Sequence, residues 1–237
     1  MKVTRFLLSA LFLAAMATTA SAQGAVSLNW DNCTGPINKQ IAPGQTNNGL
    51  FASVLGHNQP HQAYQVFVLL GSGNAGAIRD AWRFDAPGCQ GSTAIAINHL
   101  GKACPSFQGA LASIQIKDYS FDALTGKARA VLANTYPAGN NTQIDPAVRY
   151  FLASFVFDHS FSVVGPSDPG QTCGGLEVAV CAHLTRTSWL SPSGVETPWA
   201  YGQEYVTAND PNNSSGCPGA TPAVSKTWGE VKAQYKR

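Results

Sequence analysis

Residues 148–163 have the sequence VRYFLASFVFDHSFSV, and the alternation within this stretch decides the fold class that we expect. Successive side chains of a β-strand point to opposite faces of a sheet, so every second residue shares a face. One face of a strand formed by 148–163 would carry five of its apolar residues: Phe151, Ala153, Phe155, Phe157 and Phe161. A strand with this pattern predicts a sheet that packs one face into an apolar core.

The same period of two recurs along much of the remaining chain. Val26, Leu28 and Trp30 share one face of an early strand, and residues 113–121 and 127–134 flank a short turn and predict a hairpin. Further strands are expected at four places: 50–55, 64–70, 93–98 and 176–184. Strands therefore account for most of the regular structure that the sequence predicts.

Eight or more short strands with little helix predict an all-β protein. We expect a single-domain antiparallel β-sandwich of the jelly-roll or immunoglobulin-like kind, formed by residues 23–237 and stabilised by disulfides. Helical signals are few. Residues 76–82 favour one short helical turn, and Thr227 with Glu230 has the spacing of a capping box, which predicts a short C-terminal helix.

The first 22 residues have the pattern of a signal peptide. Lys2 and Arg5 precede the apolar stretch 6–16, and residues 20–22 are a small-x-small cleavage signal. We therefore expect cleavage between Ala22 and Gln23, and a secreted or periplasmic protein. The longest purely apolar run after the leader is 66–70, which is too short to cross a bilayer, so no membrane insertion is expected.

Charge is sparse and balanced. Charged residues make up 12% of the chain, against roughly 25% in an ordinary soluble protein. Without the leader, the chain carries 13 basic and 13 acidic side chains. Because nucleic-acid binding needs a basic stripe that neutralises phosphates, this composition excludes nucleic acid as an expected partner.

The sequence contains an even number of cysteines, which predicts three disulfides in an exported chain. A zinc site is the rival interpretation, but no CxxC pair is present. Six cysteines allow fifteen pairings. Cys89 and Cys104 flank the apolar run 94–97 and are the expected local pair, and for the others we expect Cys173 with Cys217 and Cys33 with Cys181.

Several short motifs occur in a characteristic order: LNWDNC at 28–33, AWRF at 81–84, FDH at 157–159, CGG…VC over 173–181, and GCPG…TWGEVK over 216–232. Together they resemble a family of uncharacterised secreted bacterial β proteins. The motifs span nearly the whole mature chain, so the resemblance implies one domain. It also implies further cysteines near Pro43 and at Leu176, which this chain lacks, and their joint absence suggests that these two positions pair in the family. The family has no established activity, so the resemblance implies no catalytic residue.

Two histidine motifs were considered as catalytic or metal sites. His57 and His61 are four residues apart, but Pro60 breaks any helix that would bring them to one metal, so an incidental pair in a loop is the better interpretation. Asp158 and His159 are neighbours in a strand and point to opposite faces, so the carboxylate cannot orient the imidazole. We expect His159 to be partly buried and hydrogen-bonded.

Common hydrolase motifs are absent from the sequence. There is no GxSxG nucleophile elbow, and residues 165–170, GPSDPG, have the composition of a turn. A glycosidase needs two carboxylates in one cleft. Glu177, Glu196 and Glu204 are present, but nothing in the sequence pairs them. The sequence therefore predicts no catalytic residue.

One segment has the composition of a binding surface. Residues 187–205 place four aromatic side chains among Ser, Pro and Gly: Trp189, Trp199, Tyr201 and Tyr205. On an exposed loop, such rings could stack on a sugar or contact a partner protein. The alternative, which we favour, is that the rings close one end of the sandwich core.

Three functions are compatible with these patterns. The leading interpretation is a secreted, non-enzymatic β domain with a binding or surface-structural role, whose partner is an extracellular protein or a glycan. The second is a carbohydrate-binding module that uses the aromatic residues of 187–205. The third is an extracellular hydrolase whose catalytic residues meet only in the folded chain. No cofactor and no metal ion are expected.

Overall fold

The structure, a computed structural model, describes residues 24–73, 76–91, 95–96, 104–106, 114–136, 144–168 and 172–210. The predicted signal peptide and the predicted C-terminal helix lie outside these residues. Within them, no helix is long and apolar enough to cross a membrane.

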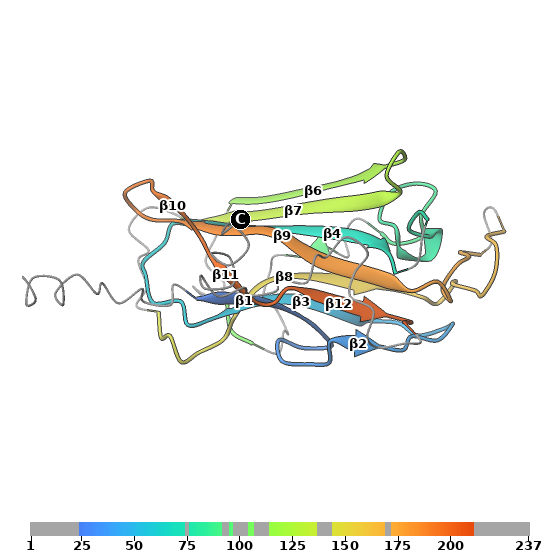
Figure 1. Cartoon of the computed structure of the whole chain (residues 1–237), viewed down its shortest axis with the longest axis horizontal. Coiled ribbons are helices and arrows are strands. Elements are labelled where there is room, and N and C mark those ends of the chain that lie inside the picture. Colours follow the sequence, from blue (N-terminus) through green and yellow to red (C-terminus); the bar gives the residue numbers. More distant parts are fainter. Residues whose placement is uncertain are drawn as a thin grey trace, which may run out of the picture.

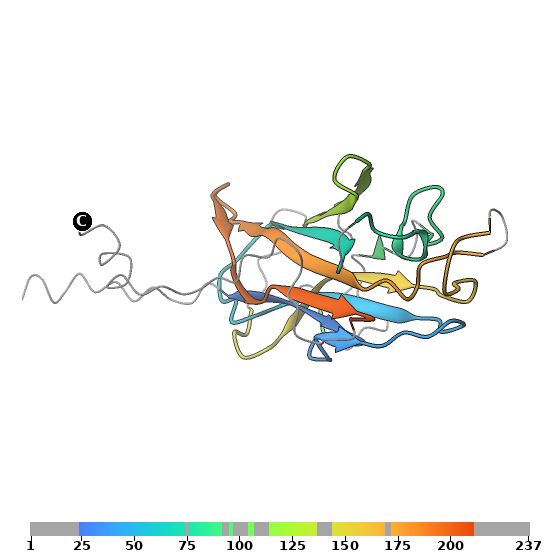
Figure 2. The same ribbon diagram turned by 45° about the vertical axis from the view of Figure 1, so that its right-hand side comes forward.

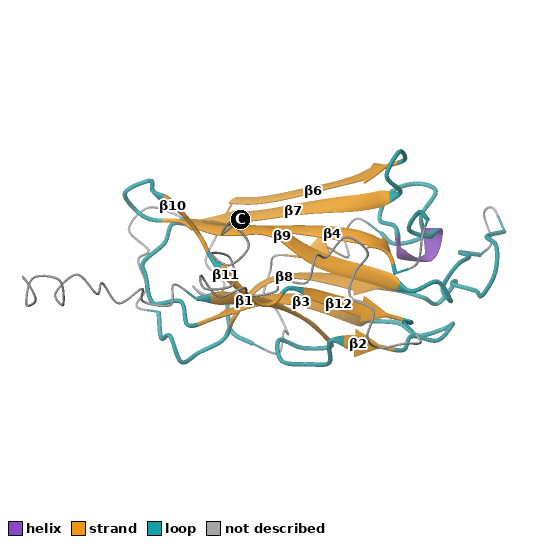
Figure 3. Ribbon diagram, in the orientation of Figure 1, coloured by secondary structure: helices purple, strands orange, loops and turns teal. Residues whose placement is uncertain are grey.

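Two β-sheets pack face to face, with almost no helix in the described residues (Figures 1 and 3). The five-stranded sheet has the order β11 (Ala200–Gln203), β1 (Ala25–Trp30), β3 (Asn48–Leu55), β8 (Tyr150–Phe157) and β5 (Ile95–Ala96). The seven-stranded sheet has the order β2 (Asn38–Lys39), β12 (Tyr205–Ala208), β9 (Val180–Leu190), β4 (Ala63–Ser72), β7 (Lys127–Thr135) and β6 (Ile114–Asp122), with β10 (Glu196–Pro198) paired to β9. A short 3₁₀ helix, η1 (Asp80–Trp82), follows β4. The predicted all-β sandwich is confirmed.

The last strands pass from one sheet to the other and back (Figure 2). β10 pairs with β9, β11 then lies parallel to β1 in the opposite sheet, and β12 returns to pair with β9. The β1–β11 and β2–β12 pairs are parallel, whereas the other strand pairs of the two sheets are antiparallel. Because β11 covers the edge of β1, the unpaired backbone groups of that edge are not left open to another chain.

The core lies between the sheets and follows from the period-two pattern. In β4, buried and partly exposed residues alternate without a break. At the centre, the buried ring of Phe157 lies 5.8 Å from Trp30, 5.5 Å from Trp82 and 5.1 Å from Phe84, measured between ring centroids. These rings come from β8, from β1 and from the segment that includes η1, so one cluster joins elements far apart in the sequence.

Two buried hydrogen bonds connect the sheets directly. The indole N–H of Trp30 in β1 donates to the carbonyl oxygen of Thr207 in β12 at 2.8 Å. The hydroxyl of Tyr64 in β4 donates to the carbonyl oxygen of Leu152 in β8, also at 2.8 Å. Because a buried polar group is costly without a partner, these two bonds favour one spacing and one register of the sheets.

The prediction that alternate residues of the 148–163 stretch all face the core is wrong at both ends of the stretch. The pairing of β3 with β8 shifts by one residue, because Ala52 lies opposite Ala153 while Ser53 lies opposite Phe151. The shift separates Phe151 from the main core, and its ring packs instead with Phe51, at 6.3 Å between centroids. At the other end, β8 stops at Phe157, and Phe161 is 72% exposed.

The predicted disulfide pairing is also wrong. Cys33 is bonded to Cys104, and Cys89 is bonded to Cys173. Cys181 is disulfide-bonded too, so none of the three expected pairs forms, and Cys217 lies outside the described residues. Cys89 and Cys104 do not pair because they lie in different parts of the fold. Cys104 lies beside Phe151, whose N–H donates to the Pro105 carbonyl, whereas the Cys89 N–H donates to the carbonyl of Asp80 in η1.

Truncation of the Phe157 ring tests the central role of the core cluster. Phe157→Ala should lower the free energy of unfolding by about 3–5 kcal/mol, because it leaves a cavity between the sheets. Urea unfolding with the disulfides intact measures this change. Phe161→Ala is the matched control and should change the stability by less than about 0.5 kcal/mol, because that ring is exposed. Equal losses in the two variants would contradict the assignment.

Candidate binding site

The aromatic segment 187–205 is not an open loop. It forms the end of β9, then β10, β11 and the start of β12. Trp189 is 6% exposed and Trp199 is 3% exposed, whereas Tyr205 is partly buried and Tyr201 is 40% exposed. The expectation of an exposed aromatic row is therefore wrong for both tryptophans, which belong to the core, as the favoured alternative predicted.

Two histidines pack beside these tryptophans, although the sequence predicted no role for them. His57 and His61 lie in the connection between β3 and β4, and both are buried. The His57 ring lies 5.1 Å from Trp189 and 5.3 Å from Trp199, between ring centroids. The two histidines do lie in a loop, as interpreted, but the pair is not incidental, because the two imidazoles are buried and pack together.

The hydrogen bonds of this pair determine where the protons lie. The indole N–H of Trp199 donates to Nδ1 of His57 at 3.1 Å, so that nitrogen carries a lone pair. A neutral His57 then carries its proton on Nε2 and donates to Nδ1 of His61 at 3.2 Å. A metal on Nε2 of His57 would move that proton to Nδ1, where it would face the Trp199 N–H, so the observed bond disfavours a metal shared with His61. The three side chains form one hydrogen-bonded chain, from Trp199 through His57 to His61.

Burial and the neighbouring His57 lower the pKa of His61 to about 3. An unfolded histidine has a pKa of about 6.5. Between these two values the unfolded chain binds a proton that the folded chain does not bind. The stability from a neutral His61 is therefore fully present above about pH 6.5 and is lost progressively as the pH falls toward 3.

We expect His61→Asn to flatten the pH dependence of stability. Asn keeps an acceptor near the position of Nδ1 but does not titrate, so the slope of unfolding free energy between pH 6.5 and 4 should fall by up to about 1.4 kcal/mol per pH unit. Urea unfolding at a series of pH values measures the slope. His159, whose pKa burial lowers to about 4, still contributes. An unchanged slope would show that His61 does not titrate with unfolding.

The other residues singled out in the sequence have separate local roles. His159 is buried, and its Nδ1 lies 3.0 Å from the hydroxyl of Ser162. Glu196 hydrogen-bonds Arg186 and Ser188, and Glu204 pairs with His183 at 2.8 Å. Glu177 accepts a hydrogen bond from the N–H of Gly165, at the rim of a pocket.

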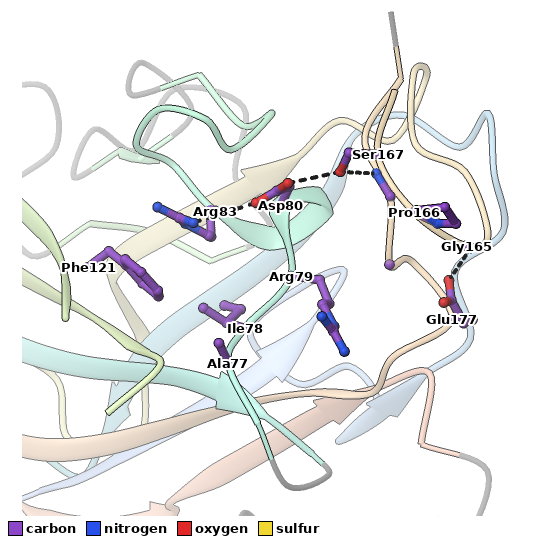
Figure 4. A pocket seen from close by; sticks show the side chains of 12 residues that line it. Ala77, Ile78, Arg79, Asp80, Arg83, Phe121, Gly165, Pro166, Ser167 and Glu177 are labelled. Carbon is purple, nitrogen blue, oxygen red and sulfur yellow. Dashed lines mark hydrogen bonds and ion pairs between the residues drawn. The ribbon is translucent and has the colours of Figure 1, made fainter. Parts of the chain in front are cut away.

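This pocket has a volume of about 650 Å³ (Figure 4). It lies at the end of the sandwich that carries η1, the helix drawn in purple in Figure 3. One wall is formed by residues 77–83, and the other by residues 165–167 and 174–177. Phe121, at the end of β6, lies at its side. Sequence analysis interpreted 165–170 only as a turn and did not consider residues 77–83 as part of a site.

Two contacts join the walls, the Cys89–Cys173 disulfide and the Ser167–Asp80 hydrogen bond, and a third lies within the second wall. The Cys89–Cys173 disulfide joins the segment after η1 to the opposite wall. The hydroxyl of Ser167 donates to the carboxylate of Asp80 at 2.9 Å and accepts from the N–H of Gly174 at 3.0 Å (Figure 4). Because these contacts lie within the protein, the pocket is formed before any ligand arrives.

One of the two pocket arginines, Arg83, already pairs with carboxylates of the protein. The Arg83 guanidinium pairs with Asp85 and with Asp80 and lies 3.8 Å from the centroid of the Phe121 ring. The hydrogen bond to Asp85 is the main cause that raises the pKa of Arg83. Its charge is therefore compensated within the protein.

Arg79 is different, because its guanidinium forms no ion pair or side-chain hydrogen bond with the described part of the chain. Its aliphatic stem passes over Gly175, where an added Cβ would lie 2.5 Å from Cβ and Cγ of Arg79. Gly175 also has a φ of +85°, which favours glycine. Figure 4 shows Arg79 and Glu177 on the same side of the pocket, below Asp80 and Ser167. The site thus presents one cation that is uncompensated in the sense that no carboxylate of the described residues pairs with it, although Glu177 lines the same pocket.

Comparison with known proteins gives no family assignment. No protein-family model matches the sequence, and no curated protein matches it. Similar solved structures include the second type II cohesin module of the ScaA scaffoldin of Acetivibrio cellulolyticus, at 11% identity over 79% of this chain and 97% of that chain, with a TM-score of 0.39. A chain from a type II cohesin–X-dockerin complex of the same organism has 12% identity over 78% and 98%, with a TM-score of 0.41. A cohesin module of a family 33 glycoside hydrolase from Clostridium perfringens has 13% identity over 79% and 98%, with a TM-score of 0.35.

Proposed function

We propose that this protein is a secreted or periplasmic, non-enzymatic binding domain, and that it binds an anionic group in the pocket beside Arg79. The observation that carries this proposal is the uncompensated guanidinium in a preformed pocket. Arginine is the side chain best suited to anions such as carboxylates, because its planar group donates two parallel hydrogen bonds to them.

The chemistry of the pocket favours binding over catalysis. Its one hydroxyl side chain, that of Ser167, donates to Asp80 and accepts from a backbone N–H. A nucleophilic serine needs a base such as histidine within hydrogen-bond reach. His57, His61 and His159 are buried elsewhere in the core, so they are not placed to serve this hydroxyl.

The carbohydrate-binding alternative through residues 187–205 has less support. It required several exposed rings in a row, and the two tryptophans are buried. Tyr201 remains the ring with substantial exposure in that segment. The two disulfides support a location outside the cytoplasm, because structural disulfides persist in oxidising compartments.

The proposal predicts where an anionic ligand changes the backbone environment. Amide chemical shifts of residues 23–237 would be followed as short peptides and oligosaccharides are added, each in an acidic and a neutral form. Acidic members should shift the amides of residues 77–83, Gly174 and Gly175, and Arg79→Gln should remove these shifts while the protein stays folded.

Arg129→Gln is the matched control, because Arg129, the third residue of β7, is exposed and does not line the pocket. This variant should keep the shifts of the original protein. The proposal is overturned if no acidic member shifts the pocket amides, or if the saturable shifts gather around Tyr201.

A further inference from the structure

The end of the sandwich that carries the pocket also exposes large apolar side chains. Leu124, in the turn between β6 and β7, is 98% exposed, Phe161 is 72% exposed and Val164 is 65% exposed. Isolated exposed apolar residues are ordinary, but a group of them at a polar pocket is typical of an interaction site.

Backbone contacts place the segments that carry these side chains beside the pocket. The N–H of Ile78, a pocket residue, donates to the carbonyl of Gly126 in the turn that carries Leu124. Val164 directly precedes Gly165, which lines the opposite wall. The carbonyl of Phe161 accepts from the N–H of Cys173, next to Gly174. The segments that carry these exposed side chains therefore border the pocket on both of its walls.

We propose that the pocket receives a protein segment that carries one Asp or Glu between apolar side chains. The carboxylate pairs with Arg79, and the apolar neighbours cover Leu124 and Val164. This inference rests on the proposed function and adds the class of partner. The charge of Arg79 selects an anion, and the apolar rim selects a ligand that also offers apolar surface, since burial of such surface is favourable.

An acidic glycan fits the same cation but not its surroundings. A sugar ring usually stacks on an exposed aromatic face, and the Phe121 ring in this pocket is already covered by the Arg83 guanidinium. A uronate would also leave Leu124 and Val164 in water. A peptide with a carboxylate and apolar side chains can pair with Arg79 and cover the apolar rim at the same time.

Glu177 makes the pocket selective for a segment that carries only one acidic residue. Its carboxylate lines the pocket with Arg79 and accepts one hydrogen bond from Gly165, which leaves further acceptor capacity. A backbone N–H of the bound segment can donate to it, whereas a second carboxylate beside the first would be repelled. A segment with one acid among neutral residues is therefore preferred over a run of acids.

The test uses three probes: a blocked short peptide with one Asp between Leu and Val, its Asn counterpart, and an oligogalacturonate. We expect the Asp peptide to bind residues 23–237 more tightly than the other two. Arg79→Gln should weaken its binding about 10- to 100-fold, because a hydrogen bond to a charged group contributes about 1.5–3 kcal/mol. Arg79→Glu should restore binding to a peptide with Lys in place of Asp.

The Leu124→Ser variant tests whether the partner is a peptide with apolar side chains, independently of anion binding by Arg79. It should weaken the Asp peptide several-fold and leave the stability of the protein unchanged. Val195→Ser is the matched control, because Val195 is 59% exposed in the turn between β9 and β10, at the opposite end of β9, and this variant should bind the peptide normally.

The outcomes distinguish the two proposals. If oligogalacturonate binds in an Arg79-dependent way and the Asp peptide does not, the peptide inference is overturned and the proposed function stands. Binding of the Asp peptide that is insensitive to Leu124→Ser also overturns the peptide inference. If no acidic probe binds at the pocket, the proposed function fails and the inference fails with it.

Discussion

Phe157 is packed among rings from three separate parts of the chain, and the rest of the structure depends on this contact. Trp30 approaches it from β1, and Trp82 and Phe84 approach it from η1 and the residues that follow. The same contact that closes the core therefore fixes η1 at the end of the sandwich. Arg79 immediately precedes η1, so the position of the one uncompensated pocket cation is determined by apolar packing rather than by charge.

Local patterns in the sequence were sufficient for most strands. The alternation in β1, β3, β4, β6 and β7 predicted each of these strands, because a strand's face depends on its own residues. The features that failed depend on a partner. The shift at Leu152 arises from the pairing of β8 with β3, and the burial of Trp199 depends on His57, which is 142 residues away. Neither partner is visible in the local sequence.

The pocket was not predicted for the same reason. Its walls are two segments separated by more than eighty residues, and the Cys89–Cys173 disulfide, with a sequence separation of 84, holds them together. A lone Arg79 in the sequence is an ordinary surface residue. It becomes distinctive only because Arg83 takes the nearby Asp80 and Asp85, and because Gly175 leaves room for its stem. The tandem glycines after Cys173 were the one local sign that two segments approach closely there.

The two disulfides with both cysteines in the described residues interlace, because Cys89 lies inside the Cys33–Cys104 loop and Cys104 lies inside the Cys89–Cys173 loop. If the chain is exported from its N-terminus, as we propose, Cys33, Cys89 and Cys104 reach the oxidant before Cys173. Oxidation in order of arrival would join wrong neighbours, and the native pairs would then require thiolate exchange. The pocket is thus closed only when Cys89 is still available, or has been released, at the time Cys173 can reach it.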